Sequence, residues 1–333
     1  MAYTIVRYQE EHEEIWDEFI KQQSINGTFL QERAFLNYHG KNKFKDASLL
    51  FFLNNELAAL CPACEIMEEG KKVFYSHKGS TYGGFVVKKS IYKTEKIMQL
   101  IGDFEEYLIQ EHYDKCVLKP TMQLLCKENV DLLEFCLYYN HYKEYKELNL
   151  YIDYNTYNQD ILSNLSHMKQ RIVKKCFKEG IVMRELTKEE EIREFYTVLE
   201  NNLKKFNTKP VHTADELLDL YWSRVPGRVK FYGAYLQNKI VAGTMVFLFK
   251  ETMCAHTQYL AADLEYNKLS PMSFVYYSAA KIYKELGYKT LSWGITTEHL
   301  GKEINMGLTK NKEDYGSSYI TNYIYEKELG STL

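Results

Sequence analysis

Residues 229–249 read VKFYGAYLQNKIVAGTMVFLF, and this stretch decides the fold. Two runs rich in Val, Ile, Tyr and Phe flank the polar pair Gln237-Asn238, which predicts a hairpin of strands 229–236 and 239–249. The elements that follow are a strand over 254–261, an amphipathic helix over 271–286 and a short strand over 288–293. Strands that alternate with helices in this way predict an α/β fold with a mixed sheet.

The same plan occurs a second time, earlier in the chain. Residues 49–61 read LLFFLNNELAALC and predict a hairpin around Asn54-Asn55. The elements after it are, in the same order, a strand over 73–77, a helix over 91–111 and a strand over 113–118. A duplicated unit predicts two similar domains with a cleft between them, and clefts commonly house chemistry. The polar segment 153–159 is the boundary candidate, which gives domains of residues 1–155 and 156–333.

The composition is that of an ordinary globular protein. The chain has 333 residues, 45% hydrophobic and 26% charged, enough for about two domains of ~150 residues. A net charge of -3 argues against a DNA-binding protein but leaves room for a local basic patch. No apolar run reaches the ~20 residues of a membrane span, and the N-terminus is not signal-like. We therefore expect a cytoplasmic protein without an integral membrane segment.

Cys61-Pro62-Ala63-Cys64 has the spacing of a metal or redox motif. A zinc site needs four ligands, and the sequence has no second Cys-x-x-Cys and no paired His motif. A thioredoxin-like pair would lie at a helix start, whereas this pair follows a strand. We therefore expect two strand cysteines and no metal, and the seven scattered cysteines fit reduced thiols.

Two polar loops precede the two long helices. Residues 76–84, SHKGSTYGG, contain three glycines that let backbone amides approach a ligand, and His77 and Tyr82 are the substrate-binding candidates there. The alternative for this loop is turn chemistry without a ligand. The alternative for the later loop, residues 262–270, is a solvated polar loop.

The corresponding later loop, residues 262–270, ends in Ser270-Pro271. This pair is a helix-start signal, because serine can cap free amides and proline fits the first turn. A helix N-terminus favours anions, so Lys268 and Ser270 are candidates for binding the phosphates of an acyl carrier.

His256 and Gln258 lie two residues apart on the strand 254–261. Because side chains alternate along a strand, we expect both on one face. Facing a cleft, they would orient a polar acceptor; facing the core, they would bond to neighbouring backbone.

The segment 293–316 is the densest group of polar and glycine residues, and it begins at the end of a predicted strand. There Glu298 can accept a proton from an attacking amine, and Lys312 can hold a carbonyl or phosphate oxygen. Asn305 is a further substrate-binding candidate. The alternative is an exposed polar loop.

Between the copies of the plan, the sequence predicts a helix over residues 124–139 and a strand over 147–152 that ends the first half. Two further helices are predicted over residues 163–178 and 189–206. The first ends at Gly180 and places Arg171, Lys175 and Lys178 on one side. Such a face is either simply solvated or binds a phosphate-bearing substrate, with Arg171 as the candidate.

Four segments together resemble the GNAT acyltransferase superfamily: Lys169–Lys175 with Gly180, Val241–Gly243, His256–Tyr259 and Gly307–Gly316. The chain as a whole is similar to the tandem-GNAT, FemAB-like aminoacyltransferases of peptidoglycan bridges. The resemblance implies two GNAT-like domains around a cleft, in which an activated acyl or aminoacyl group passes to an amine of an envelope precursor. By the same resemblance, Lys312 matches a substrate-contacting lysine and Arg171 lies on the helix that opens the second domain.

The sequence departs from this resemblance at two points. It has no counterpart of the helical-hairpin arm, which weakens the case for an aminoacyl-tRNA donor. It also lacks the Gln/Arg-x-x-Gly-x-Gly/Ala pyrophosphate loop of acyl-CoA users before Pro271. The donor, acetyl-CoA or another acyl-CoA or an aminoacyl carrier, stays open.

These observations predict an acyltransferase that acts on an amine of a saccharide or peptide precursor of the cell envelope. His256, Glu298 and Lys312 are the predicted catalytic residues, and holding an amine against an activated carbonyl can contribute about 7 to 11 kcal/mol. The rivals are an acetyl-CoA-dependent N-acetyltransferase of a small amine, and a binding protein that keeps the fold without turnover.

Overall fold

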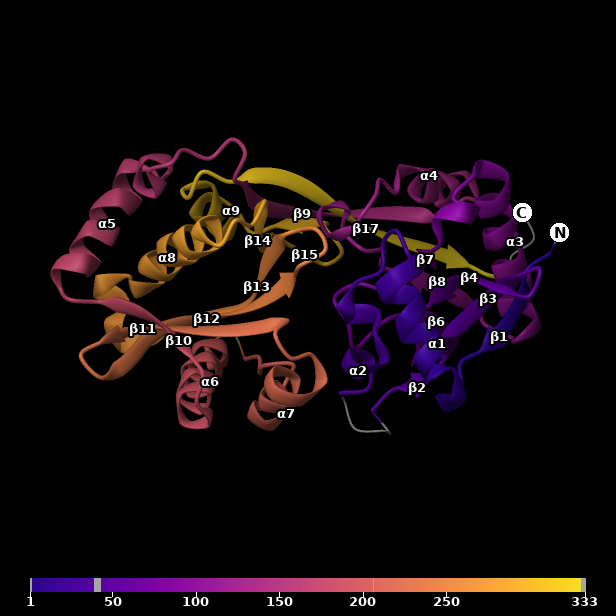
Figure 1. Ribbon diagram of the computed structural model, residues 1–333, viewed down its shortest axis with the longest axis horizontal. Helices are drawn as coiled ribbons and strands as arrows, with labels where there is room; N and C mark the ends of the chain where they lie inside the picture. The colour runs from indigo at the N-terminus through magenta and orange to yellow at the C-terminus, as the bar shows by residue number, and fades with distance from the viewer. Residues whose placement is uncertain (1, 39–42, 206, 331–333) are drawn as a thin grey trace. The chain divides into compact units, whose positions relative to one another are not determined.

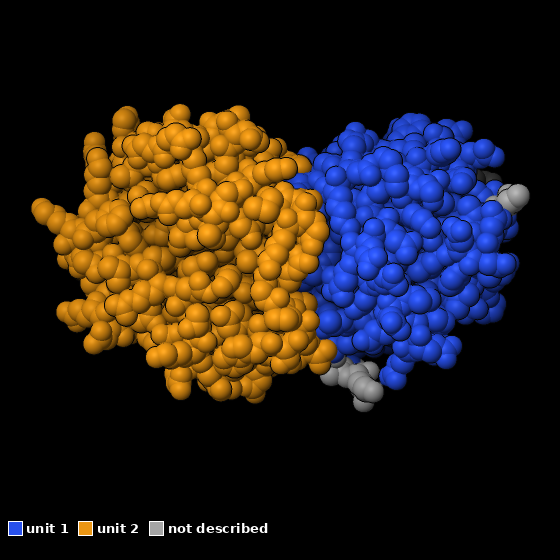
Figure 2. All heavy atoms as spheres, in the orientation of Figure 1, with its two compact units in different colours: residues 1–147, 321–333 blue, residues 148–320 orange. Residues whose placement is uncertain are grey.

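The computed structural model describes residues 2–38, 43–205 and 207–330. The chain forms two compact units (Figure 2), unit 1 with residues 1–147 and 321–333 and unit 2 with residues 148–320. We predicted domains of 1–155 and 156–333, whereas the compact units divide after residue 147. Residues 321–333 join unit 1 because Tyr325–Glu328 pair with a strand of that unit.

Unit 1 contains two groups of strands. The first has the order β1 (Thr4–Arg7), β3 (Leu49–Leu53), β4 (Glu56–Cys61) and β7 (Val86–Val87). The second has the order β17 (Ser318–Glu328), β8 (Lys115–Leu118), β6 (Lys71–Ser76), β5 (Cys64–Glu68) and β2 (Lys45–Asp46). The α-helices are α1 (Glu13–Glu18), α2 (Arg33–Leu36), α3 (Thr94–Gln110) and α4 (Asp131–Tyr139).

The early copy of the sequence plan is confirmed. β3 and β4 form the hairpin, and Asn54 and Asn55 have φ of +53° and +65°, which suits the right-handed twist of the strands. In α3, Ile97, Ile101, Phe104 and Leu108 form a fully buried stripe, spaced as on one face of a helix. Cys61 ends β4 and Cys64 begins β5, so these are two strand cysteines, although β5 itself was not predicted.

Unit 2 is a sheet with helices on both faces. Its strand order is β10 (Val182–Leu186), β11 (Val229–Leu236), β12 (Lys239–Phe249), β13 (Cys254–Ala262), β14 (Thr290–Ile295) and β9 (Lys143–Asp153). In Figure 1, α5 (His167–Lys178) and α8 (Pro271–Glu285) cover one face, and α6 (Glu189–Lys204) and α7 (Ala214–Asp219) cover the other. A hairpin of β15 (Thr297–Glu298) and β16 (Glu303–Ile304) and the helix α9 (Met306–Glu313) follow β14.

The late copy of the plan is confirmed too. β11, β12 and the start of α8 lie where the sequence predicts them, and α8 ends one residue early, at Glu285. The helix predicted over 163–178 begins at His167, because Ser166 caps it by accepting from the Lys169 amide. The helix predicted over 189–206 is α6, which ends at Lys204, and residue 206 lies outside the described residues. The helix predicted from residue 124 begins only at Asp131, as α4.

The two copies differ where a parallel strand pair ends. In unit 2, β13 and β14 pair only from Cys254 to His256, and β13 then runs on to Ala262 beside β12 alone. We call this opening between β13 and β14 the splay. In unit 1, the parallel pair β6 and β8 stays together, and its pairing is extended by a bridge between Gly83 and Pro120.

Candidate active site

His256 is the last residue of β13 that pairs with β14, so its side chain stands at the splay. The side chain is buried, and its Nδ1 lies 3.0 Å from the Ser292 Oγ of β14. Burial and, to a lesser extent, the nearby Lys312 charge lower the pKa of the His256 imidazole to about 4. His256 is therefore neutral at physiological pH, which leaves one ring nitrogen able to accept a proton.

Lys312 reaches the same place from α9. Its Nζ donates to the carbonyl oxygens of Gly294, at 2.9 Å, and Ile295, at 2.8 Å, at the end of β14. Only 3% of the residue is exposed, and burial lowers the pKa of Lys312 to about 7. An ammonium removed from water in this way gains from any negative charge that develops beside it.

Gly294 explains how the two side chains come together. Its φ of +82° lies in the region that glycine tolerates best, and this turns its carbonyl oxygen toward the Lys312 amine. A Cβ added at Gly294 would lie 3.7 Å from His256 Cε1 and 3.9 Å from Lys312 Nζ. His256 and Lys312 thus border one small volume next to Gly294.

The predicted proton acceptor Glu298 lies on the exposed β15–β16 hairpin. Its Oε1 accepts from the Asn305 amide at 3.3 Å. Asn305 in turn caps α9, because its side-chain oxygen accepts from the Leu308 amide at 3.0 Å. The side chain of Asn305 therefore stabilises the start of α9. Of the three predicted catalytic residues, the structure brings together His256 and Lys312, whereas Glu298 lies on the exposed hairpin.

Gln258 does not simply share a face with His256. The β12–β13 register shifts, so that Val246 pairs with Thr257 and Met245 with Tyr259, which leaves Gln258 as the extra residue of a β-bulge. The alternation on which the prediction rested is interrupted at this point. Gln258 is half-buried beside the splay.

The loop before α8 does not form the predicted cap. Ser270 has φ +50°, and its hydroxyl donates to the Asn267 carbonyl at 3.2 Å instead of accepting from the helix amides. Residues Leu264–Leu269 form a 3-10 helix, and Lys268 is exposed on it. Ser270 therefore ends one helix rather than capping the next.

The same loop is where the pyrophosphate of an acyl-CoA would bind, so its amides and charges show whether that group fits. A bound pyrophosphate needs free amides, yet the amides of Glu265 and Tyr266 are taken by Asp263, and that of Ser270 by Asn267. The loop carries the carboxylates of Asp263 and Glu265, which both pair with Lys239. Three amides that already have acceptors, together with two nearby carboxylates, disfavour a pyrophosphate at this loop.

Arg171 lies on the exposed side of α5, with Lys174, Lys175 and Lys178. Lys175 Nζ donates to the Lys268 carbonyl at 3.5 Å, so this basic face lies next to the loop before α8. On the buried side of α5, Lys169 Nζ donates to Asn311 Oδ1 of α9 at 2.6 Å. α5 is thus tied to the helix that carries Lys312.

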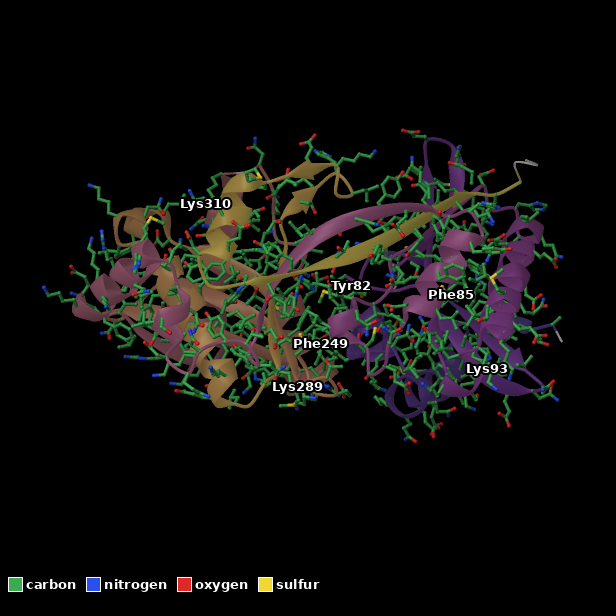
Figure 3. The ribbon with its side chains drawn as sticks, turned by 90° about the horizontal axis from the view of Figure 1, so that it is seen from above. Tyr82, Phe85, Lys93, Phe249, Lys289 and Lys310 are labelled. Atoms are coloured by element: carbon green, nitrogen blue, oxygen red, sulfur yellow. The ribbon has the colours of Figure 1, made fainter. Side chains whose placement is uncertain are left out.

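His77 and Tyr82 lie in unit 1, whereas all the other candidates lie in unit 2. Both are buried; His77 Nδ1 accepts from the Gly79 amide at 2.9 Å. The Tyr82 hydroxyl, labelled in Figure 3, lies 3.8 Å from Met122 Sδ and accepts from Asn322 at 3.4 Å. The predicted contact of His77 and Tyr82 with substrate stays a prediction.

The described residues contain no cluster of three or more His, Cys, Asp or Glu side chains able to hold a metal ion. In the same part of the chain, no helix combines the length and the apolar character needed to cross a bilayer. All seven cysteines are buried free thiols.

Sequence reasoning missed Ser292, Asn149 and the importance of Gly294. Ser292 lies between apolar strand residues, and Asn149 stands in a strand predicted only as the end of the first half. Neither has a local signal, because their proximity to His256 arises from the pairing of β9, β14 and β13.

Comparisons with known proteins agree with this architecture. The acetyltransferase (GNAT) domain family matches residues 167–301, which include the splay. No curated protein matches the sequence. Among solved structures, FemX has a TM-score of 0.69 at 13% identity, over 98% of this chain and 97% of its own.

Two further structures have the same fold. L-PGS from Bacillus licheniformis has a TM-score of 0.60 at 14% identity, over 98% of this chain and 94% of its own. A tandem GNAT protein from the clavulanic acid biosynthesis pathway has a TM-score of 0.59 at 7% identity, over 100% of both chains. Residues 167–301 therefore match the acetyltransferase (GNAT) domain family, and the chain as a whole has the fold of FemX and of the tandem GNAT protein.

Proposed function

We propose that the protein is an acyltransferase that moves an acyl or aminoacyl group from an activated ester or thioester onto an amine of a cell-envelope saccharide or peptide precursor. One observation carries this proposal. In a GNAT domain, at the splay, a buried lysine and a buried neutral histidine border the same small volume next to Gly294.

Lys312 stabilises the charge that develops on the acyl oxygen. Two of its N–H groups are held by the Gly294 and Ile295 carbonyls, which leaves one direction for a third partner. The ammonium is poorly solvated, so its interaction with an oxyanion is stronger in the transition state than with the neutral carbonyl of the ground state.

His256 accepts the proton that the attacking amine loses. The bond from nitrogen to the acyl carbon forms, the oxyanion collapses, and the carrier leaves with the electron pair of the broken ester bond. Because burial keeps the imidazole neutral, its free nitrogen can take the amine proton directly or through one water. No covalent enzyme intermediate is required.

The donor is more consistent with a carrier other than acyl-CoA. Three bonded amides and two carboxylates disfavour a pyrophosphate at the loop before α8, whereas Arg171 and the lysines beside it on α5 present an exposed basic face. We infer that this face binds a phosphate-bearing carrier such as an aminoacyl-tRNA. Glu298 is retained as a candidate for contacting the acceptor amine from the exposed hairpin.

A transfer assay tests the proposal. Aminoacyl-tRNAs charged with labelled amino acids and labelled acetyl-CoA are offered in parallel, with amino sugars and peptides bearing a free amine as acceptors. We expect transfer from one donor class, and a ~10²- to 10³-fold lower rate for Lys312→Met. Lys310→Met is the matched control, because Lys310 is exposed on the same helix (Figure 3). Equal rates for Lys312→Met and wild type would refute the role of Lys312, and no transfer from any donor would favour the binding-protein alternative.

A further inference from the structure

A chain of hydrogen bonds runs behind His256 across three neighbouring strands. His256 Nδ1 lies 3.0 Å from Ser292 Oγ, and Ser292 Oγ lies 3.1 Å from Asn149 Oδ1. The three residues stand on β13, β14 and β9, whose pairing fixes their spacing. Ser292 and Asn149 are fully buried and His256 nearly so, so water does not compete for these bonds.

The direction of each bond follows from counting protons. The Ser292 hydroxyl has one proton, and Asn149 Oδ1 can only accept, so the hydroxyl donates to Asn149. The same hydroxyl oxygen already accepts from the Gly294 amide at 3.3 Å. Because the Ser292 hydroxyl proton is donated to Asn149, the Ser292 oxygen can only accept a hydrogen bond from His256 Nδ1.

We infer that Asn149 and Ser292 are positioning residues, which hold the proton of neutral His256 on Nδ1 and leave Nε2 as the bare proton acceptor. Free histidine favours the opposite form, with the proton on Nε2, so the arrangement requires the two partners. The inference rests on the proposed function for its catalytic meaning, because an Nε2–H imidazole could not take the proton of an acceptor amine through that nitrogen.

The surroundings of the ring agree with this assignment. His256 Cε1, which lies between the two ring nitrogens, faces Gly294 on the side where Lys312 Nζ is found. The charge nearest to the ring belongs to Lys312, which opposes a second proton on the imidazole. Nδ1 is occupied by Ser292, so Nε2 is the nitrogen left for a substrate.

NMR identifies the tautomer of His256 directly, and the measurement needs neither an acyl donor nor an acceptor amine. The protein is labelled with ¹⁵N-histidine, and long-range correlations of the ring nitrogens identify which nitrogen carries the proton. The chain has nine histidines, so a His256→Gln variant assigns the His256 signals by difference. We expect Nδ1 to show the protonated shift and Nε2 the unprotonated shift in the wild-type protein at neutral pH. An Nε2–H ring in the wild-type protein would overturn the inference.

Two variants separate positioning from packing. Ser292→Ala removes the acceptor, so we expect the His256 proton to move to Nε2. Asn149→Asp keeps an acceptor at the end of the chain, so we expect the Nδ1–H form to persist. Thermal melting and the amide spectrum show whether each variant is folded. If Ser292→Ala does not fold, the wild-type and Asn149→Asp spectra still decide the question.

The outcomes also separate this inference from the proposed function. A wild-type Nε2–H ring, or a Ser292→Ala variant that keeps Nδ1–H, removes the positioning role and leaves acyl transfer by Lys312 standing. An Nδ1–H ring in a protein that transfers no acyl group would confirm the hydrogen-bond chain and count against the proposed function. If both hold, Ser292→Ala lowers the transfer rate, whereas Asn149→Asp retains most of it.

Discussion

At the scale of single residues, Lys312 is a buried amine held by the carbonyl oxygens of Gly294 and Ile295. A lysine whose pKa is lowered to about 7 destabilises the folded state below that pH, where it must stay charged while buried. The unfolded chain holds this proton up to its ordinary pKa of 10.5, so the penalty is relieved as pH rises from about 7 to 10.5. Such a penalty is common at catalytic positions.

We therefore expect Lys312→Met to remove this penalty while it lowers the transfer rate. In urea denaturation, the variant should gain stability relative to wild type at pH 6, on the order of a few kcal/mol. The gain should shrink toward pH 10. Lys310→Met, on the exposed side of α9, should show no such trend. A difference that does not depend on pH would mean that the lysine keeps an ordinary pKa.

Gly294 permits a second prediction at this scale. Gly294→Ala places a side chain in the left-handed region, which costs about 1–2 kcal/mol, and its methyl group enters the volume between His256 and Lys312. Gly287→Ala is the matched control, because Gly287 has a similar φ of +77° and open space around it. We expect similar losses of stability by urea denaturation in both variants, and a loss of transfer only in Gly294→Ala. Full transfer by Gly294→Ala would place the reacting group elsewhere.

At the scale of elements, hydrophobic periodicity predicted the two hairpins and the long helices α3 and α8, because each depends on local patterns. The details of the loops and of the strand register were not predicted correctly. Ser270 was predicted to cap α8, yet the preceding 3-10 helix takes its hydroxyl and its amide. The bulge at Gln258 had no signal in the sequence, since it arises from the register of β12 and β13. His256 and Lys312 could be named from the sequence, but their common location depends on β14 and Gly294.

The closed loop before α8 leads to a prediction about the donor. We expect titration calorimetry with acetyl-CoA to show no saturable binding up to about 1 mM, because its pyrophosphate would meet bonded amides and two carboxylates. Inorganic pyrophosphate is the control, since weak salt-dependent binding to the basic face of α5 should affect both ligands equally. Saturable micromolar binding of acetyl-CoA would instead support the N-acetyltransferase alternative.

At the scale of the whole molecule, the two occurrences of the plan differ at the end of their parallel strand pairs. Unit 2 keeps the splay between β13 and β14, with His256 and Lys312 beside it. In unit 1, the parallel pair β6 and β8 is extended by the bridge between Gly83 and Pro120, and the buried His77 and Tyr82 belong to that loop. We infer that the reaction takes place in unit 2, where the parallel strands separate beside His256 and Lys312.

The most direct test of this account is a crystal structure with a stable analogue that joins an acyl group to an acceptor amine. We predict density for the analogue at the splay, with its carbonyl oxygen within hydrogen-bonding distance of Lys312 Nζ and its nitrogen near His256 Nε2. Density for the analogue in unit 1, or at the loop before α8 without contact to Lys312, would contradict the account.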